Sequence, residues 1–203
     1  CLAAAIPAIA RTDIDTSASA DASESSANQA GFTLSHLSPQ QTLREAEFYF
    51  PLQHAKQSTL AQILSRHRGG LPTALPSHPV LQGMMHGFID LIFEHEGRFF
   101  LADYKSNFLG DCLEEYHYQA MLEANQHHYY DLQYLIYSLA LHRYLGQRIP
   151  TYNAATHFGG VYYLYLRGMS PKSTSGVFAK AISIEELNQL DHLFAGEIAG
   201  ELP

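Results

Sequence analysis

The chain has 203 residues, of which 46% are hydrophobic and 12% aromatic, enough for one domain with a substantial core. Acidic residues outnumber basic ones by 20 to 12 and the formal net charge is -8, which argues against a protein held on nucleic acid by bulk attraction alone. The only cysteines, Cys1 and Cys112, exclude a disulfide framework, a four-cysteine zinc site and a four-cysteine iron–sulfur cluster, and they fit a reducing cytoplasm.

The first part of the chain, up to residue 31, carries little pattern of a folded domain. Residues 1–10, CLAAAIPAIA, begin without methionine and are interpreted as the end of a truncated helix. A second interpretation is the acylated cysteine of a lipoprotein. No run reaches the roughly 18 apolar residues of a membrane-spanning helix, so no membrane association is expected. Residues 11–31 are rich in Ser, Ala and Asp, which predicts a flexible low-complexity linker or insertion.

Strand and helix patterns begin near residue 45. The segment EAEFYFPLQ (45–53) is typical of a short aromatic strand, and STLAQILSRH (58–67) has apolar residues at helical spacing. Three prolines make residues 72–79 irregular. Two strand-like runs, 84–95 and 98–106, then flank a turn signal at positions 96 and 97, which predicts a β-hairpin.

The second half of the chain predicts two helical regions around one further strand. Residues 114–145 carry an apolar stripe with a period of 3.6, as one helix or as two broken near 127–131, with Gly146 as the expected C-terminal stop. GGVYYLYLR (159–167) is strand-like, and Ser183 and Glu186 have capping-box spacing at the start of a final helix, 183–200. This order predicts an α/β fold in which a mixed central sheet is flanked by helices.

Three charged residues interrupt the predicted hairpin. With a two-residue turn, the numbers of facing residues sum to 193, which places Asp90 opposite Asp103 with their Cβ atoms about 5 Å apart. Lys105 points to the same face as Asp103. Two converging carboxylates form a hard-oxygen site suited to Mg²⁺ or Mn²⁺, beside a lysine that can position or activate a water. The alternative is that both acids lie at fraying strand ends and Lys105 forms an ordinary salt bridge.

An aspartate on one strand followed by Asp-x-Lys on the next is the pattern of the PD-(D/E)xK nuclease superfamily, although the motif alone is short. The segments GFIDLIFEHEGRFFLADYKSNFLG, YDLQYLIYSLALHRYL and HFGGVYYLYLRG resemble the C-terminal nuclease domain of the RecB subunits of exodeoxyribonuclease V, the RecBCD helicase-nuclease. The resemblance runs from about Phe32 to Gly200. It implies a PD-(D/E)xK, restriction-endonuclease-like core for residues 32–203, and it favours the truncated helix for residues 1–10.

The resemblance also implies roles for five residues. Asp90, Asp103 and the backbone carbonyl of Tyr104 would bind the metal, and Lys105 would complete the catalytic set with the two aspartates. Gln133 and Tyr137 match the Q-x₃-Y element of RecB-like nucleases, and their spacing puts both on one helix face. They would contact DNA or support the active site. Without the resemblance, an ordinary pair on a helix surface is the alternative.

Other candidate ligands are less well placed. In the family a histidine on an upstream helix completes the metal site, and none of the 12 histidines here matches its position. His86 is nearest to the motif and is equally compatible with a solvent-facing strand position. His127 and His128 are adjacent rather than four residues apart, which makes a poor chelate on a helix. Glu47 could support a metal-bound water or could be an ordinary strand-edge residue.

The resemblance implies a Mg²⁺-dependent exodeoxyribonuclease domain that acts in recombinational double-strand-break repair. Its substrate would be linear duplex DNA unwound to single strands, and its partners would be the RecC and RecD subunits. Delivery of DNA by the motor subunits would account for the negative net charge. The alternative is a non-catalytic RecB-like module that docks on partners or holds a strand. The isolated fragment is expected to be inactive if the missing histidine is essential.

Overall fold

The computed structural model describes residues 5–6, 32–75, 78–171 and 173–196. Its centre is a five-stranded sheet with the order β3-β4-β5-β6-β7. β5 and β6 are parallel, and the other neighbouring strands are antiparallel. The strands are β3 (Thr42–Lys56), β4 (Val80–His95), β5 (Arg98–Lys105), β6 (Phe158–Tyr165) and β7 (Val177–Lys180).

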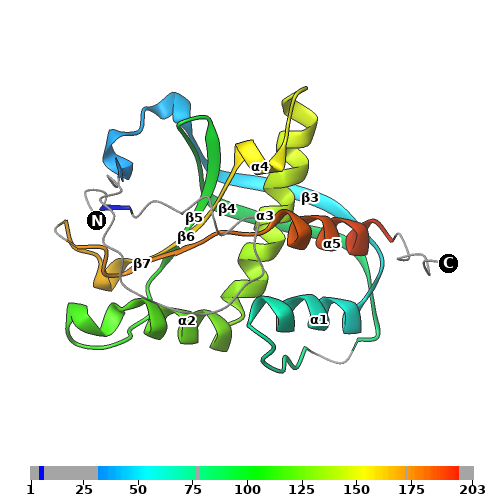
Figure 1. The fold of residues 1–203 in the computed structure, drawn as a ribbon, viewed down its shortest axis with the longest axis horizontal. Helices are drawn as coiled ribbons and strands as arrows, with labels where there is room; N and C mark the ends of the chain where they lie inside the picture. The colour runs from blue at the N-terminus through cyan, green and yellow to red at the C-terminus, as the bar shows by residue number, and fades with distance from the viewer. Residues whose placement is uncertain (1–4, 7–31, 76–77, 172, 197–203) are drawn as a thin grey trace.

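Helices flank this sheet, so the predicted α/β fold with a mixed central sheet is confirmed (Figure 1). The helices are α1 (Gln57–His67), α2 (Tyr118–His127), α3 (Tyr130–Arg148), α4 (Ala154–His157) and α5 (Ile184–Ala195). One apolar cluster joins residues of α1, α2, α3 and α5 to the sheet. A smaller cluster on the other sheet face is covered by residues 32–37 and Met169.

The hairpin of β4 and β5 has the predicted register. Its pairs run from His95 with Arg98 to Leu91 with Ala102. The two turn residues have φ angles of 52° and 77°, as in the type I′ turn whose twist matches antiparallel strands. Because the register is the expected one, side chains two residues apart on β5 share a face as the sequence indicated.

β3 is longer than the sequence predicted. It spans Thr42–Lys56, 15 residues, rather than 45–53, and it pairs with β4 over this whole length with one register shift. α5 packs on its inner face, where Phe50 stacks on Phe194. The pairing partner and the helix cover lie far away in sequence, so local composition understates the length of this strand.

The 114–145 region forms two helices with a preceding 3-10 turn. α2 ends at His127 and α3 begins at Tyr130, with Tyr129 between them in the left-handed region at φ 56°. The expected stop at Gly146 is wrong, since α3 continues to Arg148. Pro150 explains the later end, because a proline restricts the preceding residue to extended conformations, and Ile149 has φ -108° and ψ 107°.

The final helix starts as predicted and ends earlier. Ser183 Oγ accepts the backbone N–H of Glu186 at 3.1 Å, and Glu186 Oε2 accepts the backbone N–H of Ser183 at 3.0 Å. This is the expected capping box. The helix stops at Ala195 because Gly196 adopts φ 73°, a left-handed conformation that glycine adopts readily. Residues 197–203 lie outside the described residues.

Several short elements were not predicted from the sequence. They are β1 (Ala5–Ile6), β2 (Phe32–Thr33), β7, α4, and the 3-10 turns η2 (Leu34–His36), η3 (Pro39–Gln41), η4 (Leu113–Tyr116) and η5 (Leu166–Gly168). β1 pairs with β2; the rest of the expected helix at 1–10, and the linker at 11–31, lie outside the described residues. Among the helices of the described part, none is long and apolar enough to cross a membrane.

Candidate active site

Asp103 and Lys105 form a buried ion pair at the end of β5. Lys105 Nζ lies 2.5 Å from Asp103 Oδ1, as expected for residues that share a face of the strand. Their exposed fractions are 4% and 7%, so each charge depends on the other for compensation. These residues are therefore not at a fraying, solvated strand end.

Asp90 approaches this pair from β4. The hairpin ladder ends at Leu91 and Ala102, so Asp90 does not extend it by pairing with Asp103 as the register predicted. Its Oδ2 instead accepts the backbone N–H of Tyr104 at 2.9 Å. Burial raises the pKa of Asp103, Lys105 opposes that rise, and the negative charge of Asp90 adds to it. The two carboxylates are therefore close enough to repel each other.

α3 presents Gln133 and Tyr137 to the same cluster. Gln133 Oε1 accepts from Lys105 Nζ at 2.8 Å, and Gln133 Nε2 donates to the hydroxyl of Tyr137 at 2.9 Å. Burial raises the pKa of Tyr137, the hydrogen bond from Gln133 lowers it less, and the charges of Asp103 and Asp90 raise it further. The hydroxyl stays protonated at neutral pH. Gln133 and Tyr137 are thus linked to Lys105 as well as to each other.

Two tyrosines in the cluster were missed by the sequence reasoning. Lys105 Nζ lies 3.8 Å from the centre of the Tyr130 ring and 4.6 Å from that of Tyr163. The Tyr163 hydroxyl also donates to Gln133 Oε1 at 2.9 Å. Tyr163 faces Asp103 across the parallel β5–β6 pair. No local pattern reveals that register, because β5 and β6 are joined through a long helical connection.

The weaker candidate ligands lie apart from this cluster. His86 Nε2 contacts Glu47 Oε1 at 3.0 Å on the exposed face of the β3–β4 pair. The Tyr49 hydroxyl donates to the same oxygen at 2.5 Å. His127 and His128 lie at the end of α2, where both are exposed. These candidate ligands contact residues near them rather than Asp90 or Asp103.

The donor chemistry of the two aspartates fits a hard cation. Asp103 uses Oδ1 for Lys105 and Asp90 uses Oδ2 for the Tyr104 N–H, so each keeps a second carboxylate oxygen for a ligand. In the part of the chain that the structure describes, no group of three or more His, Cys, Asp or Glu side chains is placed to hold a metal. Such a two-carboxylate site suits Mg²⁺, which usually keeps several waters and binds through one or two carboxylates.

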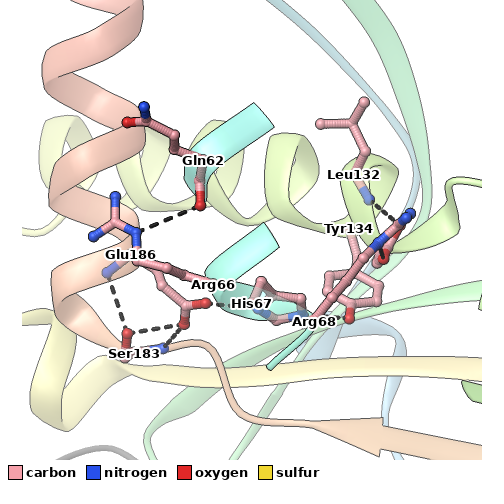
Figure 2. A network of polar contacts seen from close by, with 9 residues as sticks. Gln62, Arg66, His67, Arg68, Leu132, Tyr134, Ser183 and Glu186 are labelled. Atoms are coloured by element: carbon pink, nitrogen blue, oxygen red, sulfur yellow. Dashed lines mark hydrogen bonds and ion pairs between the residues drawn. The ribbon is translucent and has the colours of Figure 1, made fainter. Parts of the chain in front are cut away.

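A second buried polar network joins α1, α3 and α5 (Figure 2). The His67 ring contacts Glu186 Oε1 through Nδ1 and the Tyr134 hydroxyl through Nε2, both at 2.6 Å. Arg68 next to it donates to both oxygens of Asp131, at 2.5 and 2.8 Å. The sequence reasoning did not identify this network. Its partners come from three helices far apart in sequence, so spacing gives no signal.

The mixed sheet, with Asp90 and the Asp103–Lys105 pair where β4 and β5 separate, defines a protein with a PD-(D/E)xK core. No protein-family profile matches the chain. RecBCD enzyme subunit RecB of Escherichia coli is 43% identical over 172 residues, covering 83% of this chain and 15% of that protein. The chain is therefore homologous to the RecB subunits of RecBCD enzymes.

Two further relatives support this assignment. The Haemophilus influenzae RecB subunit is 42% identical over 168 residues, which cover 82% of this chain and 14% of the relative. The Mycolicibacterium smegmatis RecB subunit is 32% identical over 167 residues, which cover 71% of this chain and 15% of the relative. The chain thus spans only about one seventh of the length of these relatives.

Proposed function

We propose that this chain is a metal-dependent DNA nuclease domain, the exonuclease of a RecBCD-like helicase-nuclease in recombinational double-strand-break repair. The observation that carries the proposal is the buried Asp103–Lys105 pair beside the Asp90 carboxylate. A docking surface requires no buried charges, since these are costly to keep unless paired. A metal-dependent site for phosphodiester hydrolysis, in contrast, uses carboxylates to hold the cation.

The aspartates would hold the metal ion. Asp90 and Asp103 would each offer the carboxylate oxygen that the protein leaves unused, and the Tyr104 backbone carbonyl would be a third donor. Mg²⁺ or Mn²⁺, when bound, supplies positive charge to the non-bridging oxygens and favours deprotonation of water. Because Asp103 also binds Lys105, the lysine and a bound ion would share this carboxylate.

The remaining residues would orient the reactants. Two N–H groups of the Lys105 ammonium are directed to Asp103 and Gln133, which leaves a third for a water or a phosphate oxygen. Tyr137 accepts from Gln133, so its own proton is available to donate to an anion. Preorganised donors of this kind stabilise developing negative charge without reorganising during the reaction.

The partners, location and substrate of this chain are proposed from its RecB relatives. Their names place RecB in the RecBCD enzyme, and we infer RecC and RecD subunits as partners, cytoplasmic location, and linear DNA unwound to single strands as substrate. The net charge of -8 fits delivery of the strand by motor subunits rather than capture by this domain. Tight DNA binding by the isolated chain, with a steep salt dependence, would contradict that delivery.

The test is Mg²⁺-dependent degradation of linear single-stranded DNA by the chain and by its Asp103→Asn variant. Asparagine keeps the shape of the side chain and removes the charge that binds a cation. We expect cleavage by the parent, loss of cleavage in the variant, and loss in both after EDTA. Asp191→Asn is the matched control, because Asp191 pairs with Arg143 away from the cluster.

Calorimetric titration with Mn²⁺ separates the outcomes when cleavage is absent. A parent that binds Mn²⁺ through Asp103 and still does not cut lacks a component found elsewhere in the longer subunit, and appending the upstream region should restore cleavage. A parent that neither binds Mn²⁺ nor cuts DNA is a non-catalytic module. Undiminished cleavage by Asp103→Asn would overturn the assignment of the site.

A further inference from the structure

The Lys105 ammonium is enclosed on two sides by aromatic rings. Tyr130 of α3 lies 3.8 Å away and Tyr163 of β6 lies 4.6 Å away, measured from Nζ to the ring centres. The face of an aromatic ring attracts a cation, and more strongly where water is excluded. Lys105 is only 7% exposed and Tyr163 is fully buried. The rings and the Asp103 carboxylate together leave the lysine little freedom.

The partners of Gln133 fix the orientation of its amide. Lys105 Nζ and the Tyr163 hydroxyl both reach the same end of the amide, at 2.8 and 2.9 Å. Because an ammonium can only donate, that end must be the carbonyl oxygen. The NH₂ end then faces the Tyr137 hydroxyl, at 2.9 Å. A flipped amide would turn its N–H groups toward the ammonium and would leave the Lys105 N–H without an acceptor.

This arrangement gives the hydrogen-bond chain a direction. Tyr163 donates to Gln133, and Gln133 donates to Tyr137. Tyr137 therefore accepts from Gln133 and keeps its own hydroxyl proton for another acceptor. Tyr163 is buried among apolar side chains and would be an ordinary core residue without this hydroxyl contact.

We propose that Tyr163 and Tyr130 are positioning residues that hold the Lys105 ammonium, and, through Gln133, the Tyr137 hydroxyl, in their working geometry. Tyr163 acts through its hydroxyl, which fixes the Gln133 amide. Tyr130 acts through its ring, which lies against the ammonium, whereas its own hydroxyl donates to Asn107 Oδ1 at 3.2 Å. The effect of both residues on catalysis rests on the proposed nuclease function.

The two tyrosines should therefore differ in how strongly they respond to the same substitution by phenylalanine. We expect Tyr163→Phe to lower kcat about tenfold, since it removes one hydrogen bond, with the KM for single-stranded DNA unchanged. Tyr130→Phe keeps the ring and should lower kcat less than Tyr163→Phe does. Tyr130→Leu removes the ring and should lower kcat about as much as Tyr163→Phe. A role limited to core packing would not produce this pattern.

Tyr165→Phe is the matched control. Tyr165 lies on the same strand and face as Tyr163, is equally buried, and also donates one side-chain hydrogen bond, to Asn125 Oδ1 at 2.8 Å. Its hydroxyl lies outside the Lys105 cluster. Tyr165→Phe should therefore lose similar stability and keep the parent kcat.

The deciding readout is the ¹⁵N–¹H resonance of the Lys105 ammonium in ¹⁵N-labelled protein, identified by its loss in Lys105→Met. We expect a sharp signal in the parent, in Tyr130→Phe and in Tyr165→Phe, because a held ammonium exchanges slowly. The signal should broaden or shift in Tyr163→Phe and Tyr130→Leu. An unchanged signal in both variants would overturn the proposal. Because the resonance needs no DNA, it tests the positioning roles even if the parent does not cleave DNA.

Discussion

The Asp103–Lys105 cluster and the His67–Glu186 network are both built from buried charges, yet they use their hydrogen-bonding capacity differently. In the His67–Glu186 network, Glu186 is bound by the His67 ring and by the backbone N–H and hydroxyl of Ser183. In the Asp103–Lys105 cluster, Asp90 and Asp103 each keep one carboxylate oxygen without a contact among the described residues, and the neighbouring Tyr104 is 38% exposed.

Arg68, which is labelled in Figure 2, and its partner Asp131 also have their hydrogen-bonding groups filled. Asp131 accepts two hydrogen bonds from Arg68 and one from the Leu132 N–H, and Arg68 also donates to the Gln126 carbonyl. Groups whose hydrogen bonds are all made within the protein hold helices together and are not available to bind a ligand. A buried charge therefore indicates a binding site only where part of its capacity remains open.

The largest expected effect is on catalysis, from Lys105→Met. The cleavage rate should fall by about 10²- to 10³-fold, the range for loss of one preorganised charge-stabilising group. The free energy of unfolding should fall by less than the roughly 3–5 kcal/mol of an uncompensated buried charge, because methionine replaces the apolar stem and Asp103, whose pKa is already raised by burial, can take up a proton. DNA degradation and urea unfolding measure the two quantities. Lys180→Met in β7 is the control, and a parent-like rate in Lys105→Met would refute the assignment.

The next effect is on stability, from Asp131→Ala. Arg68, whose side chain is 8% exposed, would keep a buried charge without its carboxylate, at a cost of about 3–5 kcal/mol. The nuclease rate of the folded protein should stay at the parent value. Urea unfolding of Asp131→Ala and of the double variant Arg68→Met, Asp131→Leu tests this, because an apolar pair should recover much of the loss. A loss below about 1 kcal/mol would put the pair in the class of surface salt bridges.

The comparison also separates what the sequence could predict from what it could not. The hairpin register follows from the Glu96–Gly97 turn and strand alternation, so the approach of Lys105 to Asp103 was predictable from local pattern. The contacts of Gln133 with Lys105 depend on how α3 packs on the sheet. The resemblance to RecB nucleases indicated in advance only that Gln133 would contact DNA or support the active site.

The remaining contacts were set by long-range pairing. Tyr163 meets Asp103 through the parallel β5–β6 register, which residues 106–157 between these strands do not encode locally. The departure of Asp90 from the hairpin ladder depends on where β4 separates from β5. The stop at Gly146 failed for a related reason, because a glycine ends a helix only where the chain adopts the left-handed conformation, as Gly196 does.

A smaller, pH-dependent effect is expected from Glu186. Burial would raise the pKa of its carboxyl, but the hydrogen bond and charge of His67 and the bonds from Ser183 outweigh burial and lower it from 4.5 to about 2. A depressed acid pKa contributes stability above the unfolded value, and this is lost as pH falls from about 4.5 toward 2. The contribution is about 3 kcal/mol.

Glu186→Gln tests this contribution by urea unfolding at a series of pH values. The variant should be less stable than the parent at pH 6 by up to about 3 kcal/mol, and the difference should shrink as pH approaches 2. Glu185→Gln is the control, since Glu185 is exposed one residue away on the same helix. A stability difference that does not vary with pH would mean that Glu186 acts through packing rather than through its charge.

The smallest effect is expected from Glu47, whose carboxylate is paired but exposed. Hydrogen bonds from Tyr49 and then His86 lower the pKa of Glu47, yet its side chain is 46% exposed and that of His86 is 44% exposed, so water and salt screen the pair. Glu47→Gln should leave the unfolding midpoint and the rate of DNA cleavage at their parent values. A tenfold fall in cleavage would instead mean that Glu47 supports a metal-bound water. A carboxylate that is exposed and already hydrogen-bonded to the protein would then contribute to the site, as Asp90 and Asp103 are proposed to do through their unused oxygens.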